Sequence, residues 1–235
     1  MLGNYDIDLG TVPITDWTYQ TMFALNHIAM HSTTGPPVAD TALINGTMKS
    51  ASGSGEYFKT TLKKGKKHRL RLINTGLNNL FHVSIDNHKF TVITSDFVPI
   101  KPYETDSVAI AIGQRHDIII HADQDVGNYW LRVDIGTECS RNQMAGNIKG
   151  IISYEGADDE EPTTEGRVPN TGCYDEKVRP WVDNQVDKAQ FEDALSRLDM
   201  DFNISRVDTN GPPLIQVSHK QPPPLTPTPR ATTNH

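Results

Sequence analysis

The chain of 235 residues carries 22 basic and 29 acidic side chains, a formal net charge of −7 at pH 7. Because the balance is acidic and no run of Lys or Arg could track a phosphate backbone, nucleic acid is not an expected partner. No apolar run approaches the roughly 20 residues that cross a bilayer, and the start lacks the basic and apolar segments of a secretory signal. The length suits one large domain or one domain with appendages.

The N-terminal part predicts a short strand and then a helix. The strand is expected over residues 5–9 and the helix over residues 15–31, where Thr15 and Asp16 form a cap-like pair and apolar residues recur at helical spacing. Gly35, followed by two prolines, is expected to end the helix.

From there to residue 154 the sequence predicts a series of short strands, separated by Gly, Asn and Asp. Leu70 and Leu72 alternate with Arg69 and Arg71, and other runs show the same period of two. Each strand should therefore have one dry face and one wet face, which favours an antiparallel sandwich or barrel over a parallel sheet. The predicted class is all-β with one short peripheral helix and an irregular C-terminal extension.

Residues 86–87 are Asp-Asn, a pair that tolerates positive φ and predicts a tight hairpin. In that hairpin Ile85 would face His88 and His82 would face Thr91. The two histidines would then lie on different faces of the sheet.

The nine histidines form no metal-binding pattern, and no HxH, CxxC or CxxH occurs. His116 and His121 are five residues apart in one predicted strand, which places them about 16 Å apart on opposite faces. His27 and His31 lie one helical turn apart but lack a third ligand, so we interpret them as a polar helix face. We assign no catalytic residue and no metal ligand.

Beyond residue 157 the composition changes. Residues 158–200 are acidic and contain Pro and Gly, which predicts a solvated linker after a domain over residues 1–157. Residues 186–202 fit either a short helix or the approach to a strand. We interpret residues 201–235 as the start of a missing third domain followed by a divergent Pro-rich tail, which we expect to be extended or disordered.

Two features are typical of secreted proteins. Cys139 and Cys173 would suit a single disulfide, and Asn45 and Asn203 begin N-glycosylation sequons. These features conflict with the missing signal sequence. A piece from the middle of a longer secreted protein would satisfy both observations.

Several separate motifs occur together in a characteristic order along the chain: YDIDLG, DWTYQT, GPPVADTALINGT, KKHRLRLINTG, FHVSIDNHKFTVITSDFVPIKP, TDSVAIAIGQRHDIII and DVGNYWLR. They resemble the middle, or second, cupredoxin-like domain of a fungal laccase of the ascomycete type, within the multicopper oxidase family. The resemblance covers residues 5–154 and extends more loosely to residue 216. It implies a cupredoxin-like Greek-key sandwich or barrel, and a disulfide between Cys139 and Cys173 that ties the sandwich to the linker.

The resemblance also implies an extracellular parent enzyme with three such domains and four copper ions. One copper takes electrons from phenols, and a three-copper cluster reduces O2 to water. The chain lacks the HWH, HSH, HxxHxH and HCH ligand motifs, so it resembles the one domain that binds no copper. We expect it to be inactive by itself, with the first and third cupredoxin domains as partners and phenolic small molecules as ligands of the parent.

One position of the phenol pocket wall is carried over. The family commonly has Asp or Glu where this chain has Asn78, and an amide cannot accept a proton as a carboxylate does. The parent would then gain little help in deprotonating phenols. A loop asparagine chosen for its turn geometry is the alternative interpretation.

After residue 216 the sequence departs from the family and shows no strand alternation, which suggests a truncated laccase product. The alternative function is a stand-alone, non-catalytic secreted β-sandwich that binds a partner. Exposed apolar faces would favour the fragment, and a monodisperse chain would favour the module.

Overall fold

The computed structural model describes residues 4–33, 35, 37–50, 52–167, 172–173 and 177–182. The chain divides into two compact units, residues 1–182 and 183–235. The second unit lies outside the described residues, as do the expected element over residues 186–202, the sequon at Asn203 and the Pro-rich tail. No helix within the described ranges is both long and apolar enough to cross a membrane.

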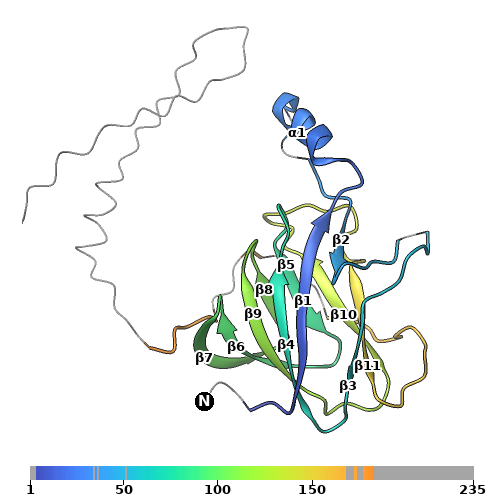
Figure 1. The fold of residues 1–235 in the computed structure, drawn as a ribbon, viewed down its shortest axis with the longest axis vertical. Coiled ribbons are helices and arrows are strands. Elements are labelled where there is room, and N and C mark those ends of the chain that lie inside the picture. Colours follow the sequence, from blue (N-terminus) through green and yellow to red (C-terminus); the bar gives the residue numbers. More distant parts are fainter. Residues whose placement is uncertain are drawn as a thin grey trace, which may run out of the picture. The chain divides into compact units, whose positions relative to one another are not determined.

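Two β-sheets form a sandwich (Figure 1). The six-stranded sheet has the order β2-β1-β4-β9-β6-β7 and comprises β1 (Ile7–Trp17), β2 (Thr41–Ile44), β4 (Lys67–Asn74), β6 (Phe90–Ser95), β7 (Val98–Thr105) and β9 (Arg115–His121). The five-stranded sheet has the order β3-β11-β10-β5-β8 and comprises β3 (Lys59–Leu62), β5 (Phe81–Ile85), β8 (Ser107–Ile110), β10 (Asn128–Ile135) and β11 (Lys149–Tyr154).

The core lies between the sheets and takes apolar side chains from both. In β4 the alternation is as predicted, because Leu70 and Leu72 are fully buried while Arg69 and Arg71 are partly exposed. Val83 and Leu131 contribute to the same core from the opposite sheet. The predicted class, a mostly β sandwich with one short helix, is therefore confirmed.

Most strand pairs are antiparallel, as expected for an antiparallel sandwich, but each sheet also contains one parallel pair that the sequence did not predict. β1 runs parallel to β4, and β3 runs parallel to β11. In both cases a strand early in the chain joins a sheet built mainly from later strands. The period-two alternation cannot reveal this, since it depends on which faces are buried and not on strand direction.

The predicted helix began too early. β1 continues through Trp17 and pairs with β2, with Thr15 opposite Leu43, so the cap-like residues Thr15 and Asp16 belong to a strand. The helix α1 spans only Met22–His31, and its N-cap is Thr21. Tertiary pairing with β2 outweighs the local helix-start signal.

The expectation of one wet face per strand fails for β5. His82 and Ser84 point away from the core, yet they are only 2% and 3% exposed. The His82 Nε2 atom lies 2.7 Å from the carbonyl oxygen of Gly172, so a later segment covers this outer face.

The turn at residues 86–87 forms with Ile85 opposite His88, as predicted, but it does not join two paired strands. It connects β5 of one sheet to β6 of the other. The predicted pairing of His82 with Thr91 is therefore wrong: His82 pairs with Asp134 and Ala109.

Candidate binding groove

A groove of about 830 Å³ is formed by the end of β1, the first turns of α1 and the loop between β4 and β5. Apolar and aromatic side chains dominate its wall, among them Trp17, Tyr19, Met22 and Leu77. Asn78, the residue carried over by resemblance, lies in the same wall. A concave, mostly apolar surface with a few polar groups is the usual form of a small-molecule site.

The helix α1 forms the outer wall of this groove and buries none of its own residues. Figure 1 shows it beyond the end of β1, away from the two sheets. The Thr21 hydroxyl accepts the N–H of Ala24 at its start, but Phe23 and Met30 are 90% and 70% exposed. Packing within the described part of the chain therefore supports α1 less than it supports any strand.

The loop that carries Asn78 is held from two sides. Asp16, at the end of β1, accepts the backbone N–H of Asn78 at 2.7 Å. From the other side, the Ser140 hydroxyl accepts the N–H of Leu80 at 2.9 Å and donates to the carbonyl oxygen of Asn78 at 3.3 Å. The backbone of this loop is therefore fixed by side chains distant in sequence.

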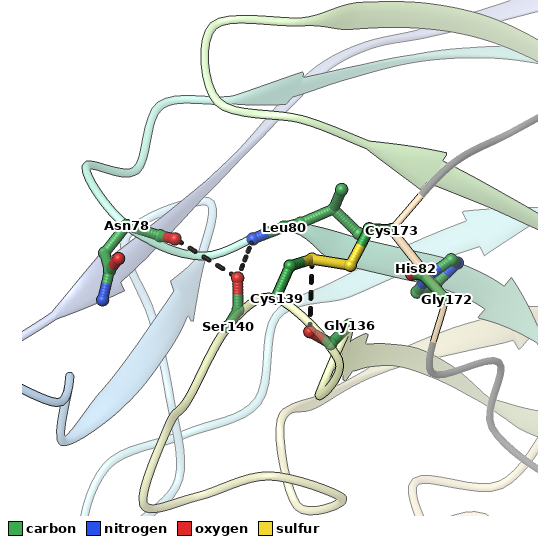
Figure 2. The surroundings of a disulfide bond; sticks show 8 residues. All are labelled: Asn78, Leu80, His82, Gly136, Cys139, Ser140, Gly172 and Cys173. Atoms are coloured by element: carbon green, nitrogen blue, oxygen red, sulfur yellow. Dashed lines mark hydrogen bonds between the residues drawn. A yellow bond between two sulfur atoms is a disulfide. The ribbon is translucent and has the colours of Figure 1, made fainter.

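A disulfide joins Cys139 to Cys173, with their Cα atoms 6.0 Å apart. Ser140 directly follows Cys139 in the chain. Figure 2 shows its hydrogen bonds with the backbone of Asn78 and Leu80. The two cysteines are 34 residues apart, and closing such a loop contributes about 3 to 4 kcal/mol in the chain-entropy model. The disulfide thus anchors the segment that supports the groove loop.

Among the residues that the structure describes, four histidines are buried: His68, His82, His88 and His116. Each commits a ring nitrogen to a hydrogen bond, with the N–H of Lys63 and the carbonyl oxygens of Gly172, Asp86 and Thr94, respectively. These bonds hold the rings separately, within different parts of the sandwich.

The hydrogen bonds of His88 define its protonation. Its Nδ1 lies 2.7 Å from the carbonyl oxygen of Asp86, which can only accept, so Nδ1 carries a proton. Its Nε2 lies 2.7 Å from the hydroxyl of Tyr154 and, in the neutral ring, accepts from it. Burial lowers the pKa of His88 and favours this neutral form.

The exposed histidines in the described part of the chain provide no metal site either. His27 and His31 stack on α1 with ring centroids 4.5 Å apart, while His121 is exposed and His116 buried on opposite faces of β9, as predicted. Within the described ranges no three His, Cys, Asp or Glu side chains are arranged to hold a metal ion. These residues therefore do not fit the copper that the resemblance implies for the parent.

Residues 158–167, here called the strap, lie along the five-stranded sheet. The amide of Asn128 donates to the carbonyl oxygens of Asp158 and Glu160, both at 2.8 Å. At the other end, the Arg167 guanidinium donates to the Asp106 carboxylate at 2.6 Å. This part of the predicted linker is thus bound to the sandwich at both ends.

An ion pair lies beneath the strap. The Arg132 guanidinium donates two hydrogen bonds of 2.7 Å to the carboxylate of Asp86, whose side chain is 1% exposed. Thr164 of the strap donates to the same carboxylate at 2.7 Å and accepts from Arg132 through its carbonyl oxygen. The bond to Asp86 raises the pKa of Arg132, whereas burial raises the pKa of nearby Asp134.

Asn45 lies in the exposed turn that follows β2, with φ of 50°. Its sequon is thus at the surface, where a glycan has room. The other predicted acceptor, Asn203, lies outside the described residues.

Sequence reasoning did not identify Asp16 and Ser140 as supports of the groove. Asp16 was interpreted as part of a helix start, and Ser140 carried no signal. Their partners in the groove loop are 60 or more residues away, so no local pattern indicates the contact.

Comparison with known proteins gives a consistent result. The family model described as multicopper oxidase matches residues 8–157. Laccase-3 of Botryotinia fuckeliana is 47% identical over 214 residues, covering 89% of this chain and 47% of the relative, and Laccase-1 of Melanocarpus albomyces is 39% identical, covering 89% and 33%. The chain therefore spans about half or less of the length of these relatives.

Solved structures show the same relationship. The laccase from Botrytis aclada matches with a TM-score of 0.68 and 40% identity, over 74% of this chain and 34% of that one. The multicopper oxidase Fet3p matches with a TM-score of 0.61 at 17% identity, a likeness of fold alone.

Proposed function

Because the chain belongs to the multicopper oxidase family, as a cupredoxin domain homologous to the laccases of ascomycete fungi, we propose that it is the central, non-copper-binding domain of a laccase-like oxidase. The arrangement of its histidines carries the proposal. A copper site needs several ligands around one ion, and within the described ranges no such group exists. In such a parent, the first and third cupredoxin domains hold the copper and perform the redox chemistry.

The groove is proposed as one wall of the site where the parent binds phenols. Its aromatic and apolar lining supports this role, since a phenol ring gains most from burial against such surface. The amide of Asn78 orients a phenol hydroxyl by hydrogen bonding but does not remove its proton.

Secretion of the parent is part of the same proposal. It is supported by the disulfide, because such bonds persist in oxidising compartments. A stand-alone binding module remains the second candidate. The exposed apolar residues of α1 favour the domain over that module, since a soluble monomer rarely leaves such a surface uncovered.

A domain replacement tests the central position. Residues 4–182 replace the matching segment of Laccase-3 from Botryotinia fuckeliana, and the same host with its own segment reinserted is the control. A domain that holds no copper leaves the copper content of the hybrid equal to that of the control. A folded, secreted hybrid that has lost copper would contradict the proposal.

Asn78→Asp in the hybrid oxidase tests the role of this position in the pocket wall. We expect kcat/KM for a phenol to rise about threefold to tenfold at acidic pH above about 4, where the new carboxylate is ionised and accepts the phenol proton. Oxidation of ferrocyanide, which has no proton to lose, serves as the control. An unchanged kcat/KM for the phenol would show that Asn78 does not act in the phenol pocket wall.

A further inference from the structure

Five consecutive backbone N–H groups of the groove loop donate to side chains. Gly76 donates to Asn74 Oδ1 at 2.9 Å, Leu77 to Asp16 Oδ1 at 2.9 Å, Asn78 and Asn79 to Asp16 Oδ2 at 2.7 Å each, and Leu80 to the Ser140 hydroxyl at 2.9 Å. Surface loops usually leave such donors to water. Here the conformation of the loop is set by the groups that accept these bonds.

Asp16 is the principal acceptor, because its two oxygens take three of the five bonds. Hydrogen bonds to a carboxylate are shorter and stronger than those between neutral groups. The carboxylate also lies close under the loop: a Cβ atom at Gly76 would come within 3.0 Å of its Cγ and Oδ2 atoms. Only glycine at position 76 allows this approach without a shift.

The position of Asp16 connects two walls of the groove. It lies in β1 opposite Ala42 of β2, and the next residue, Trp17, lines the groove from the β1 side. Leu77 and Asn78, whose N–H groups it binds, line the groove from the loop side. The bonds to Asp16 therefore tie Trp17 to the middle of the loop, while the N–H of Thr75 ties the start of the loop to the carbonyl oxygen of Ile14 in β1.

We propose that Asp16 is a positioning residue that sets the width of the groove and the place of Asn78 within it, and thereby determines which phenolic donors the parent oxidase accepts. The part of this proposal that concerns the choice of phenols rests on the function proposed above. The part that concerns the position of the loop is independent of that function.

Hydrogen exchange in the full 235-residue chain tests the fixing of the loop. In Asp16→Asn the amide NH2 group replaces one acceptor, and we expect exchange of the N–H groups of Leu77, Asn78 and Asn79 to become about tenfold faster. Asp96→Asn is the matched control, because Asp96 accepts a single backbone N–H, from Arg115, in another turn. Unchanged exchange in the groove loop of Asp16→Asn would overturn the proposal.

Kinetics of the hybrid oxidase test the selection of donors. For Asp16→Asn we expect KM for 2,6-dimethoxyphenol to rise about fivefold, with kcat changed less than about twofold, because binding is lost while the chemical step is not. Ferrocyanide, which needs no fitted pocket, should keep its KM. A purely structural role would lower the amount of active enzyme and leave both KM values unchanged.

Asn78→Ala separates the possible failures. If it raises KM for the phenol and Asp16→Asn does not, the positioning role is overturned while the proposed pocket wall stands. If neither variant changes KM, the proposed wall fails, and donor selection by Asp16 fails with it. Should Asp16→Asn not fold, Gly76→Ala displaces the loop from an intact Asp16, and the same changes in exchange and KM are expected.

Discussion

The outer face of the five-stranded sheet and the groove end of the sandwich differ in the side chains that they bury and expose. On the sheet face, polar groups are buried: Gly172 lies against His82, and the strap binds Arg132 and the buried Asp86. At the groove end, apolar residues such as Phe23 and Met30 stay exposed. Polar groups are buried in one region and apolar groups are exposed in the other, the reverse of the usual rule.

This difference indicates what each region contributes. The covered face forms hydrogen bonds and an ion pair that fold the chain onto itself, so changes there should alter stability. The groove end leaves its apolar surface unused within the described residues, so changes there should alter binding or association. Three predictions, from the largest effect on stability to the smallest, test this contrast.

Asp86→Ala should have the largest effect. It leaves the guanidinium of Arg132 without its carboxylate beneath the strap and removes a bond to Thr164. Breaking a buried ion pair from one side costs about 3 to 5 kcal/mol, which urea unfolding of the full chain would measure. Asp159→Ala is the control, because Asp159 lies in the same strap and pairs with Lys59 of β3 but is fully exposed. Equal stability of the two variants would contradict the contrast.

The second prediction concerns acid sensitivity. Burial lowers the pKa of His88 in the folded chain, so as pH falls the unfolded chain, with an ordinary pKa of about 6.5, takes up the proton first. This contribution to the free energy of unfolding is complete above about pH 6.5 and decreases as pH falls toward the lower pKa of the folded state. A charged ring would also stop accepting from the Tyr154 hydroxyl.

Urea titrations at about pH 7.5 and 5.5 measure this loss on either side of the ordinary histidine pKa. The charged groups acting on the ring, Asp86 and Asp123, oppose the effect of burial but do not reverse it. His88→Asn should give a shallower pH dependence than a substitution of the exposed His121, His121→Asn. Some pH dependence should remain from His68, whose pKa is also lowered by burial. Identical slopes in both variants would exclude His88 as a source.

The smallest effect on stability is expected at the groove end. Phe23→Ser with Met30→Ser should leave the free energy of unfolding almost unchanged, because neither side chain is buried, but should reduce self-association of the full chain. Sedimentation equilibrium measures this, with the loop variant Val126→Ser as a control for loss of exposed apolar surface. A wild-type chain that is already monodisperse would favour the stand-alone module.

Much of the fold was predictable from local pattern. The alternation around Leu70 and Leu72 gave a strand with the correct buried face, because the pleat of a strand sends successive side chains to opposite sides. The turn at residues 86–87 was predictable for a similar reason, since Asn tolerates the φ of 60° found at Asn87. Asn78 was assigned to a phenol pocket wall by resemblance; it lines a groove, and its place in a phenol pocket stays a prediction.

Where prediction failed, distant contacts outweighed local signals. Thr15 and Asp16 have the side chains of a helix start, but pairing with β2 keeps them in a strand. The composition of the strap predicts a solvated linker but does not reveal that Arg132 and Asn128 bind it to the sheet. In both cases the partners lie more than 20 residues away, beyond the reach of any window of sequence.

By itself, the sequence determined the class of the fold, the positions of most strands and the family resemblance, because these depend on periodicity and on motifs contained within short stretches. Only the tertiary structure decided which faces are covered, which strands run parallel and which carboxylate fixes the groove loop. Asp16 became a support for Asn78 because folding brings residues 62 positions apart within 2.7 Å. Hydrogen bonds act over such distances in space, whatever the separation along the chain.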